Sequence, residues 1–125
     1  MAAAIKNILI EQGATFEWGL RLLDGTGANA PAMDLSGLLL RMHIRSEVDS
    51  PVILVSLSTA AGGGITILPQ TGLTLGWLEI VIEAAATAAL AFEAAVYDLE
   101  LVQTNGRVIR VVQGAVSLSR EVTRL

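Results

Sequence analysis

The fold is indicated most clearly by Val96-Tyr-Asp-Leu-Glu-Leu101, together with the turn Thr104-Asn-Gly-Arg107 and the β-rich run Val108–Val112 that follow it. Apolar and charged residues alternate along the first run, which is the pattern of a strand with one face on a core. Asn-Gly between two such runs is a strong hairpin signal, because both residues tolerate the positive φ angles of a type I′ turn. We therefore expect two neighbouring antiparallel strands here.

The same period of two runs through most of the chain. Phe16–Asp24 places Phe16, Trp18, Leu20 and Leu22 on one side, and Leu38–Arg45 places Leu38, Leu40, Met42 and Ile44 on one side. Gly114 interrupts a later alternation, which predicts a bulge or a bend. Further strands are expected at Ile5–Ile10, Val52–Leu57, Gly64–Leu68, Leu73–Ile82, Val108–Val112 and Ala115–Leu118.

One segment breaks the alternation. Ala84–Ala94 consists largely of strong helix formers, so we expect one short helix near residues 85–92, with Thr87 as a possible cap. About seven to nine short strands at this spacing predict an all-β antiparallel sandwich. No repeat or linker divides the chain, which predicts a single β-sandwich domain over residues 1–125.

The composition points to contacts with other proteins. The chain is 53% hydrophobic and only 16% charged, with a mean hydropathy of +0.62, whereas soluble domains average about 25% charged residues. The longest nearly apolar run, Ala84–Phe92, is about half the length of a membrane-spanning helix, so we expect no membrane span. A net charge of −4 argues against nucleic-acid binding. The surplus apolar surface is therefore expected to be covered by partner chains, including further copies of this chain.

The sequence offers no complete catalytic, cofactor or metal site. It contains no cysteine, and its single histidine, His43, lies between Arg41 and Arg45 on one predicted strand face. A zinc site needs three or four donors, and a catalytic triad needs a suitably placed nucleophile. We therefore interpret His43 as a surface or interface residue and expect no enzyme activity and no cofactor.

Acidic residues form two candidate pairs. Asp98 and Glu100 share a strand face, and Glu79 lies near Glu83 on another predicted strand. If those two strands paired, the carboxylates would form a cluster of the kind found in glycosidases and calcium sites. The alternative is a solvated face where the acids meet arginines on neighbouring strands, with Arg41, Arg107 and Arg110 as candidates.

Four residues are candidates for a protein interface. Arg41, His43 and Arg45 share one strand face, and Trp77 shares a face with Glu79 on another strand. Tryptophan and arginine are enriched at the centres of protein interfaces. Core burial is the alternative for Trp77.

Short motifs along nearly the whole chain resemble a known group of proteins. They are Glu11-Gln-Gly-Ala-Thr-Phe16, Asp34-Leu-Ser-Gly37 before Leu40–Arg45, Thr87-Ala-Ala-Leu90 before Val96–Leu101, Asn105-Gly-Arg-Val108, Gly114 and Val122-Thr123. The chain resembles the small β-sandwich proteins of tailed phages, in particular the family that contains the N-terminal domain of the baseplate upper protein. It departs from that pattern at Phe92-Glu-Ala-Ala95, where the family has a glycine-containing approach to the next strand.

The resemblance implies an immunoglobulin-like domain that joins virion parts. The function expected from it is that of a non-enzymatic structural protein of a bacteriophage virion, made in the host cytoplasm. Its most direct form is a tail or baseplate adaptor that contacts other virion proteins and itself. A capsid decoration (cement) protein and a host-surface carbohydrate-binding module are the alternatives, and a carbohydrate module would need an aromatic-lined cleft.

Overall fold

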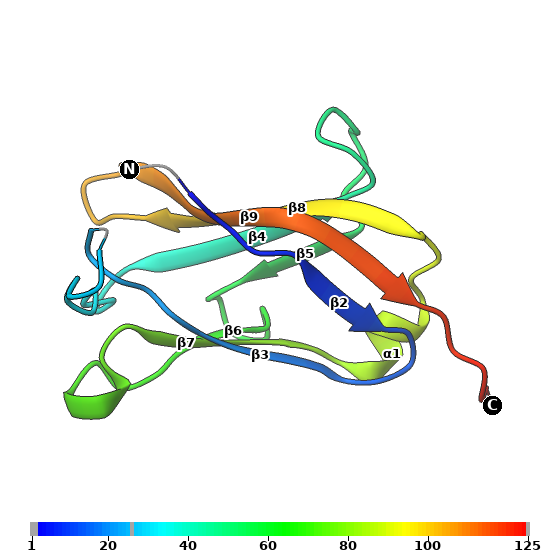
Figure 1. The fold of residues 1–125 in the computed structure, drawn as a ribbon, viewed down its shortest axis with the longest axis horizontal. Helices are drawn as coiled ribbons and strands as arrows, with labels where there is room; N and C mark the ends of the chain where they lie inside the picture. Colours follow the sequence, from blue (N-terminus) through cyan, green and yellow to red (C-terminus); the bar gives the residue numbers. More distant parts are fainter. Residues whose placement is uncertain (1–2, 26, 125) are drawn as a thin grey trace.

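The computed structural model describes residues 3–25 and 27–124, and within them the chain forms two β-sheets (Figure 1). The large sheet has the order β1-β9-β8-β4-β5, with β2 also paired to β9, and the small sheet has the order β3-β7-β6. The strands are β1 Ala4–Ile5, β2 Ile8–Glu11, β3 Phe16–Arg21, β4 Leu39–Arg45, β5 Val55–Ser58, β6 Ile65–Ile67, β7 Trp77–Ile82, β8 Ala94–Val102 and β9 Val108–Ser119. A 3-10 turn, η1 (Gly72–Thr74), and one helix, α1 (Ala84–Ala88), complete the elements.

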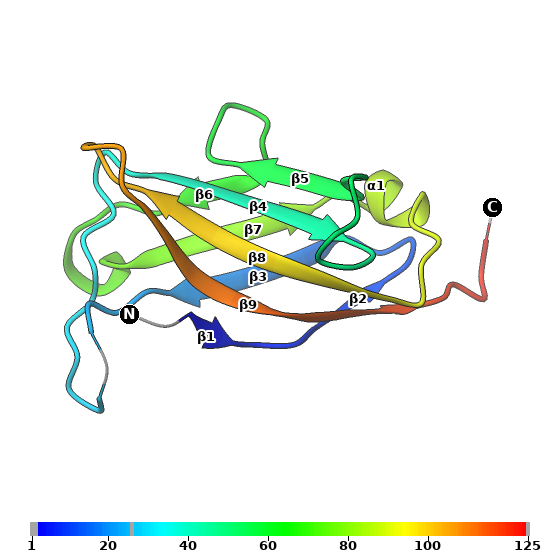
Figure 2. The ribbon, with the colours of Figure 1, turned by 90° about the horizontal axis from the view of Figure 1, so that it is seen from above.

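The strand order is that of an immunoglobulin-type sandwich. In that fold, strands G, F, C and C′ lie side by side in one sheet, and B, E and D lie in the other. Here β9, β8, β4 and β5 take the first set of places, and β3, β7 and β6 take the second. Figure 2 looks down on the large sheet, with β3 and β7 behind it. The expected all-β sandwich is confirmed.

The sequence pattern predicts purely antiparallel sheets, but the large sheet also contains parallel pairs. β1 and β2 both pair parallel with β9, while β9 pairs antiparallel with β8. The first strand of the chain therefore lies beside the last one. A parallel pair needs a long connection, and here almost the whole chain provides it.

The alternating apolar residues fill the space between the sheets. The fully buried side chains include Leu40, Met42, Ile44, Leu78, Ile80, Leu99 and Leu101. Trp18 packs edge to face against Tyr97 with ring centroids 6.0 Å apart, so an aromatic pair links β3 of the small sheet with β8 of the large one. Burying one such apolar side chain contributes about 1.5–3 kcal/mol, which makes this alternation the main specification of the fold.

The hairpin indicated by Asn-Gly forms between β8 and β9, but its turn is not type I′, because Asn105 does not have a positive φ. Gly106 has a φ of +87°, and the amide of Gln103 donates to the carbonyl oxygen of Arg107 at 2.8 Å. The bulge in this pair is not at Gly114. The register shifts where Leu99 faces Val112 and Glu100 faces Arg110, which leaves Val111 as the extra residue.

Gly114 instead lies against the backbone of the N-terminal segment at Lys6. β9 runs through it without a break, and a Cβ at this position would collide with the carbonyl oxygen of Lys6. Glycine is needed here because two backbones approach closely, which is another common reason for a strand glycine. The sequence predicted a bulge or a bend at Gly114, and the bulge part of that prediction is wrong, because the register shift lies at Val111.

The helix and several strands have different bounds from those expected. The expected strand Ile5–Ile10 is divided into β1 and β2, the expected strands Val108–Val112 and Ala115–Leu118 form the single strand β9, and β5 begins at Val55 and not at Val52. Helix α1 ends at Ala88, earlier than the expected range near residues 85–92, and Glu83 occupies its N-cap position. Thr87 does not cap the helix but lies buried within it. Strand β7 begins at Trp77 and not at Leu73, because η1 precedes it and Gly76 has a φ of +85°, which ends the turn.

Candidate interaction surfaces

The outer side of the large sheet brings together three of the four predicted interface residues. Arg41, His43 and Arg45 point outward from β4, because Leu40, Met42 and Ile44 between them are buried. Their neighbours on β8 and β9 are Asp98, Glu100 and Arg110. We call these six outward-facing side chains the front face: Arg41, His43, Arg45, Asp98, Glu100 and Arg110.

Two ion pairs cross the front face. Arg41 Nε lies 2.8 Å from Glu100 Oε1, and Arg110 Nε lies 3.4 Å from Asp98 Oδ2. Asp98 and Glu100 therefore form cross-strand ion pairs with arginines, which is the second of the two alternatives that the sequence left open. Because all four side chains keep substantial exposure, each pair contributes at most about 1 kcal/mol to stability. Besides this small contribution to stability, the two pairs hold the guanidinium groups of Arg41 and Arg110 in place on the exposed surface of the large sheet.

Arg45 ties the β4–β5 connection to the same face. Its Nη1 donates to the carbonyl oxygen of Ser50 at 2.9 Å, and its Nη2 lies 3.4 Å from His43 Nδ1. Above β4, the connecting loop rises from the large sheet (Figure 1). Val48 on this loop is 80% exposed.

A shallow hollow of about 460 Å³ lies in the front face. Its lining includes His43, Asp98 and Arg110, together with Ile5 from β1 and Val48 from the β4–β5 loop. Ile5 is 75% exposed and Val48 is 80% exposed, so exposed apolar side chains lie beside charged ones. The sequence did not reveal that Ile5 lies beside these charged residues, because nothing in the alternation of Ile5–Ile10 shows that β1 pairs with β9 in the same sheet.

Trp77, the fourth predicted interface residue, lies on the opposite side of the sandwich. It is partly exposed and points outward from β7, because Leu78 and Ile80 are buried. We call the outward-facing side chains of the small sheet the back face: Glu17, Arg21, Thr66, Trp77, Glu79 and Val81. The structure thus separates Trp77 from Arg41, His43 and Arg45, and no one surface contains all four.

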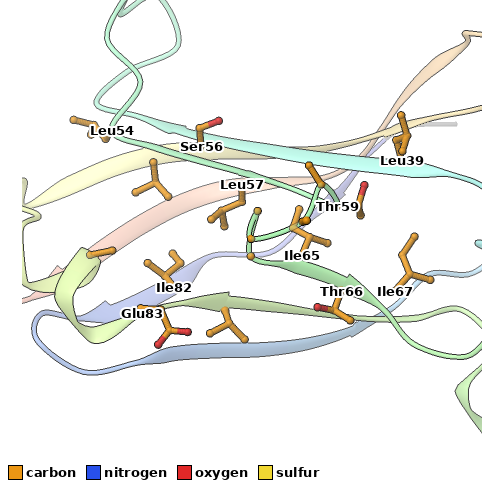
Figure 3. Close-up of a pocket in the computed structure, with 18 of the residues that line it drawn as sticks. Leu39, Leu54, Ser56, Leu57, Thr59, Ile65, Thr66, Ile67, Ile82 and Glu83 are labelled. Atoms are coloured by element: carbon orange, nitrogen blue, oxygen red, sulfur yellow. The ribbon is translucent and has the colours of Figure 1, made fainter.

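A second, larger opening lies between the two sheets at the β5 and β6 edges, with a volume of about 1100 Å³ (Figure 3). Within the described residues, β5 pairs only with β4 and β6 only with β7 as strands, so the sandwich opens along this side. Leu57, Ile65 and Ile82 are among the side chains that line the groove. No described residue of its lining is aromatic, and Glu83 is the one charged residue there. The lining therefore lacks the aromatic platform that a carbohydrate module would need.

The carboxylate cluster considered from the sequence does not form. Glu79 belongs to the small sheet, whereas Asp98 and Glu100 belong to the large one, so their strands do not pair. Across residues 3–25 and 27–124, no group of three or more potential metal-binding side chains comes together. In the same residues, no helix has both the length and the apolar character needed to cross a membrane.

One buried polar group joins the helix to the turn after β2. The Thr87 hydroxyl donates to the carbonyl oxygen of Ala14 at 2.8 Å and accepts from the amide of Gly13 at 3.0 Å. Both contacts satisfy backbone groups, so the role of Thr87 is structural.

Comparison with known proteins adds no family to this description. No protein-family model matches the sequence, and no curated protein matches it.

Proposed function

We propose that this chain is a non-enzymatic structural protein of a bacteriophage virion, a tail or baseplate adaptor that binds other virion proteins and further copies of itself. The observation that carries the proposal is the front face, where fixed arginine–carboxylate pairs lie beside exposed apolar side chains. Protein interfaces combine apolar anchors with a polar surround in this way. The assignment to a phage rests on the resemblance of the sequence motifs to tailed-phage β-sandwich proteins.

The distribution of exposed apolar residues supports a role in assembly. Single exposed apolar side chains are common on any protein, so their grouping is the informative feature. Val48, Val52 and Ile53 lie on one loop, and each is at least 43% exposed. Ile5 and Val48 border the same hollow. A partner chain that covered this area would remove several apolar side chains from water at once.

The polar groups of the front face suit binding better than catalysis. Asp98 and Glu100 each contact an arginine, and His43 contacts Arg45. General acid–base catalysis needs a proton-transferring group positioned against a substrate, usually in a cleft that excludes water. A solvent-exposed sheet with paired charges does not provide one. We therefore propose binding without chemical turnover.

The test is the composition of purified particles. Virions from a culture producing the phage that encodes this chain are banded on a density gradient, separated into heads and tails, and quantified by mass spectrometry. We expect the chain in the tail fraction in a fixed number of copies per particle. Recovery in the head fraction would favour a capsid decoration protein. A chain abundant in the lysate but absent from washed particles would contradict a structural role.

A further inference from the structure

The front face differs in charge from the rest of the molecule. It carries Arg41, Arg45 and Arg110 against two carboxylates, so its formal charge is positive. The whole chain carries a net charge of −4. The remaining surface is therefore more negative than the whole, and the front face is complementary in sign to other parts of the same molecule.

The back face has the opposite balance. It carries Glu17 and Glu79 against the single cation Arg21. Both glutamates are exposed. Trp77 lies among them, next to the bare backbone of Gly19, where a Cβ would lie 3.8 Å from its ring. A partly exposed tryptophan bordered by charges is the type of residue that dominates binding energy at interfaces.

We propose that copies of this chain associate front face to back face. In this contact, Glu17 and Glu79 of one copy lie against the arginines of the next, and Trp77 lies over the hollow between Ile5 and Val48. A two-fold contact between two front faces would bring positive charge against positive charge, whereas a front-to-back contact pairs opposite signs. An indole over arginine side chains also gains cation–π attraction.

The geometry of the sandwich determines what such a contact builds. The front and back faces lie on opposite outer sides, because the inner sides of both sheets form the core. A contact between different faces is heterologous, so it leaves a free front and a free back and continues into a ring or a stack. This inference rests on the proposed function and specifies how the adaptor would assemble with itself.

Charge reversal on exposed residues tests the contact without changing the core. The front variant carries Arg41→Glu and Arg110→Glu, and the back variant carries Glu17→Arg and Glu79→Arg. In each variant alone, the front face and the back face carry charge of the same sign. We therefore expect the dissociation constant measured by light scattering to rise at least about tenfold. Mixed in equal amounts, the acidic front of one meets the basic back of the other, and association returns. The control Glu93→Arg with Arg120→Glu, on exposed residues outside both faces, should associate like the wild type.

The outcomes separate the possibilities. Association of the back variant alone at wild-type strength would overturn the proposal in favour of a front-to-front contact. A wild-type chain that stays monomeric at millimolar concentration would also overturn it, together with self-binding. If such a chain were still found in virions, its role as an adaptor that binds other virion proteins would stand. Circular dichroism of each variant shows whether it is folded.

A second measurement is cross-linking at introduced cysteines, which is possible because the chain contains no native cysteine. Val48→Cys and Thr66→Cys chains, treated with a flexible bismaleimide, should give cross-linked dimers when mixed and none separately.

Discussion

The Tyr97 hydroxyl donates a hydrogen bond of 2.6 Å to the carbonyl oxygen of Lys6, joining residues 91 positions apart. Tyr97 belongs to the core, where it is only 4% exposed and packs against Trp18. Lys6 lies between β1 and β2, where the amide of Lys6 donates to the carbonyl oxygen of Gln113. The bond thus fixes the N-terminal segment at the place where it crosses β9. Ile5, which lines the hollow in the front face, directly precedes Lys6.

Removing this hydroxyl should loosen the N-terminal segment more than the rest of the sandwich. We expect Tyr97→Phe to lower the free energy of unfolding by about 1 kcal/mol, because the Lys6 carbonyl loses its partner while the ring keeps its packing. Urea unfolding measures this loss in the free energy of unfolding of the whole domain. Amide hydrogen exchange should quicken at residues 6–11 and stay unchanged in β4 and β7. Uniform acceleration across both sheets would contradict a local role.

The same residue should make stability depend on alkaline pH. Burial raises the pKa of Tyr97 to about 12, whereas an unfolded tyrosine has a pKa of about 10. The folded state thus favours the neutral phenol. This contribution is fully present below the unfolded pKa and is lost as the pH rises through the folded pKa. The stability difference between wild type and Tyr97→Phe should therefore be constant up to pH 10 and shift against the wild type between pH 10 and 12. Urea titrations of both proteins at several pH values measure it, and a constant difference to pH 12 would exclude this linkage.

The sequence predicted the sandwich because its core pattern is local. Alternation in Phe16–Asp24, Leu38–Arg45 and Val96–Leu101 determines which side of each strand is buried, and Asn105-Gly106 determines one hairpin. Pairing between distant strands leaves no such signal. The parallel pairing of β1 and β2 with β9 depends on contacts more than 100 positions apart. Gly114 is an example, since a Cβ there would collide with the carbonyl oxygen of Lys6 and nothing near Gly114 in the sequence shows this.

Gly114 should therefore be intolerant of even a methyl group. We expect Gly114→Ala to destabilise the fold by about 1–3 kcal/mol, because its Cβ would displace the Lys6 backbone and disturb the Tyr97 bond. Gly19→Ala is the matched control, since Gly19 is also a strand glycine and a Cβ there would make only an ordinary contact with Trp77. Thermal unfolding of the two variants gives the comparison. Equal melting temperatures would show that the N-terminal segment adjusts freely.

The candidate surfaces were predictable only in part. Strand alternation placed Arg41, His43 and Arg45 on one outward face, and the structure confirms that placement. The same rule put Trp77 on the face of Glu79 with core burial as the alternative, but alternation within a strand does not show which sheet the strand joins. The separation of Trp77 from the arginines, the hollow and the β5–β6 groove all depend on sheet assignment. They could therefore be found only from the arrangement of strands in space.

Thr87 gives a test of a buried polar contact. We expect Thr87→Val, which keeps the shape and removes the hydroxyl, to cost about 1–3 kcal/mol because the Gly13 amide loses its acceptor. Thr87→Ser keeps the hydroxyl and loses one methyl, so it should cost less. Urea unfolding compares the two, and hydrogen exchange at Gly13 locates the effect. A valine variant as stable as the serine variant would mean that water replaces the lost partner.

The final prediction concerns salt. If opposite charges hold front face to back face, raising the ionic strength from about 0.05 M to 0.5 M should weaken self-association, because exposed charges are screened within a few ångströms at the higher value. The Arg41–Glu100 and Arg110–Asp98 pairs are screened as well, but each contributes little to folding, so the melting temperature of the isolated fold should change much less than the association. Sedimentation at both ionic strengths measures the association, and calorimetry measures the fold. Association that strengthens with salt would instead indicate an apolar contact, with the Leu57, Ile65 and Ile82 groove as the next surface to substitute.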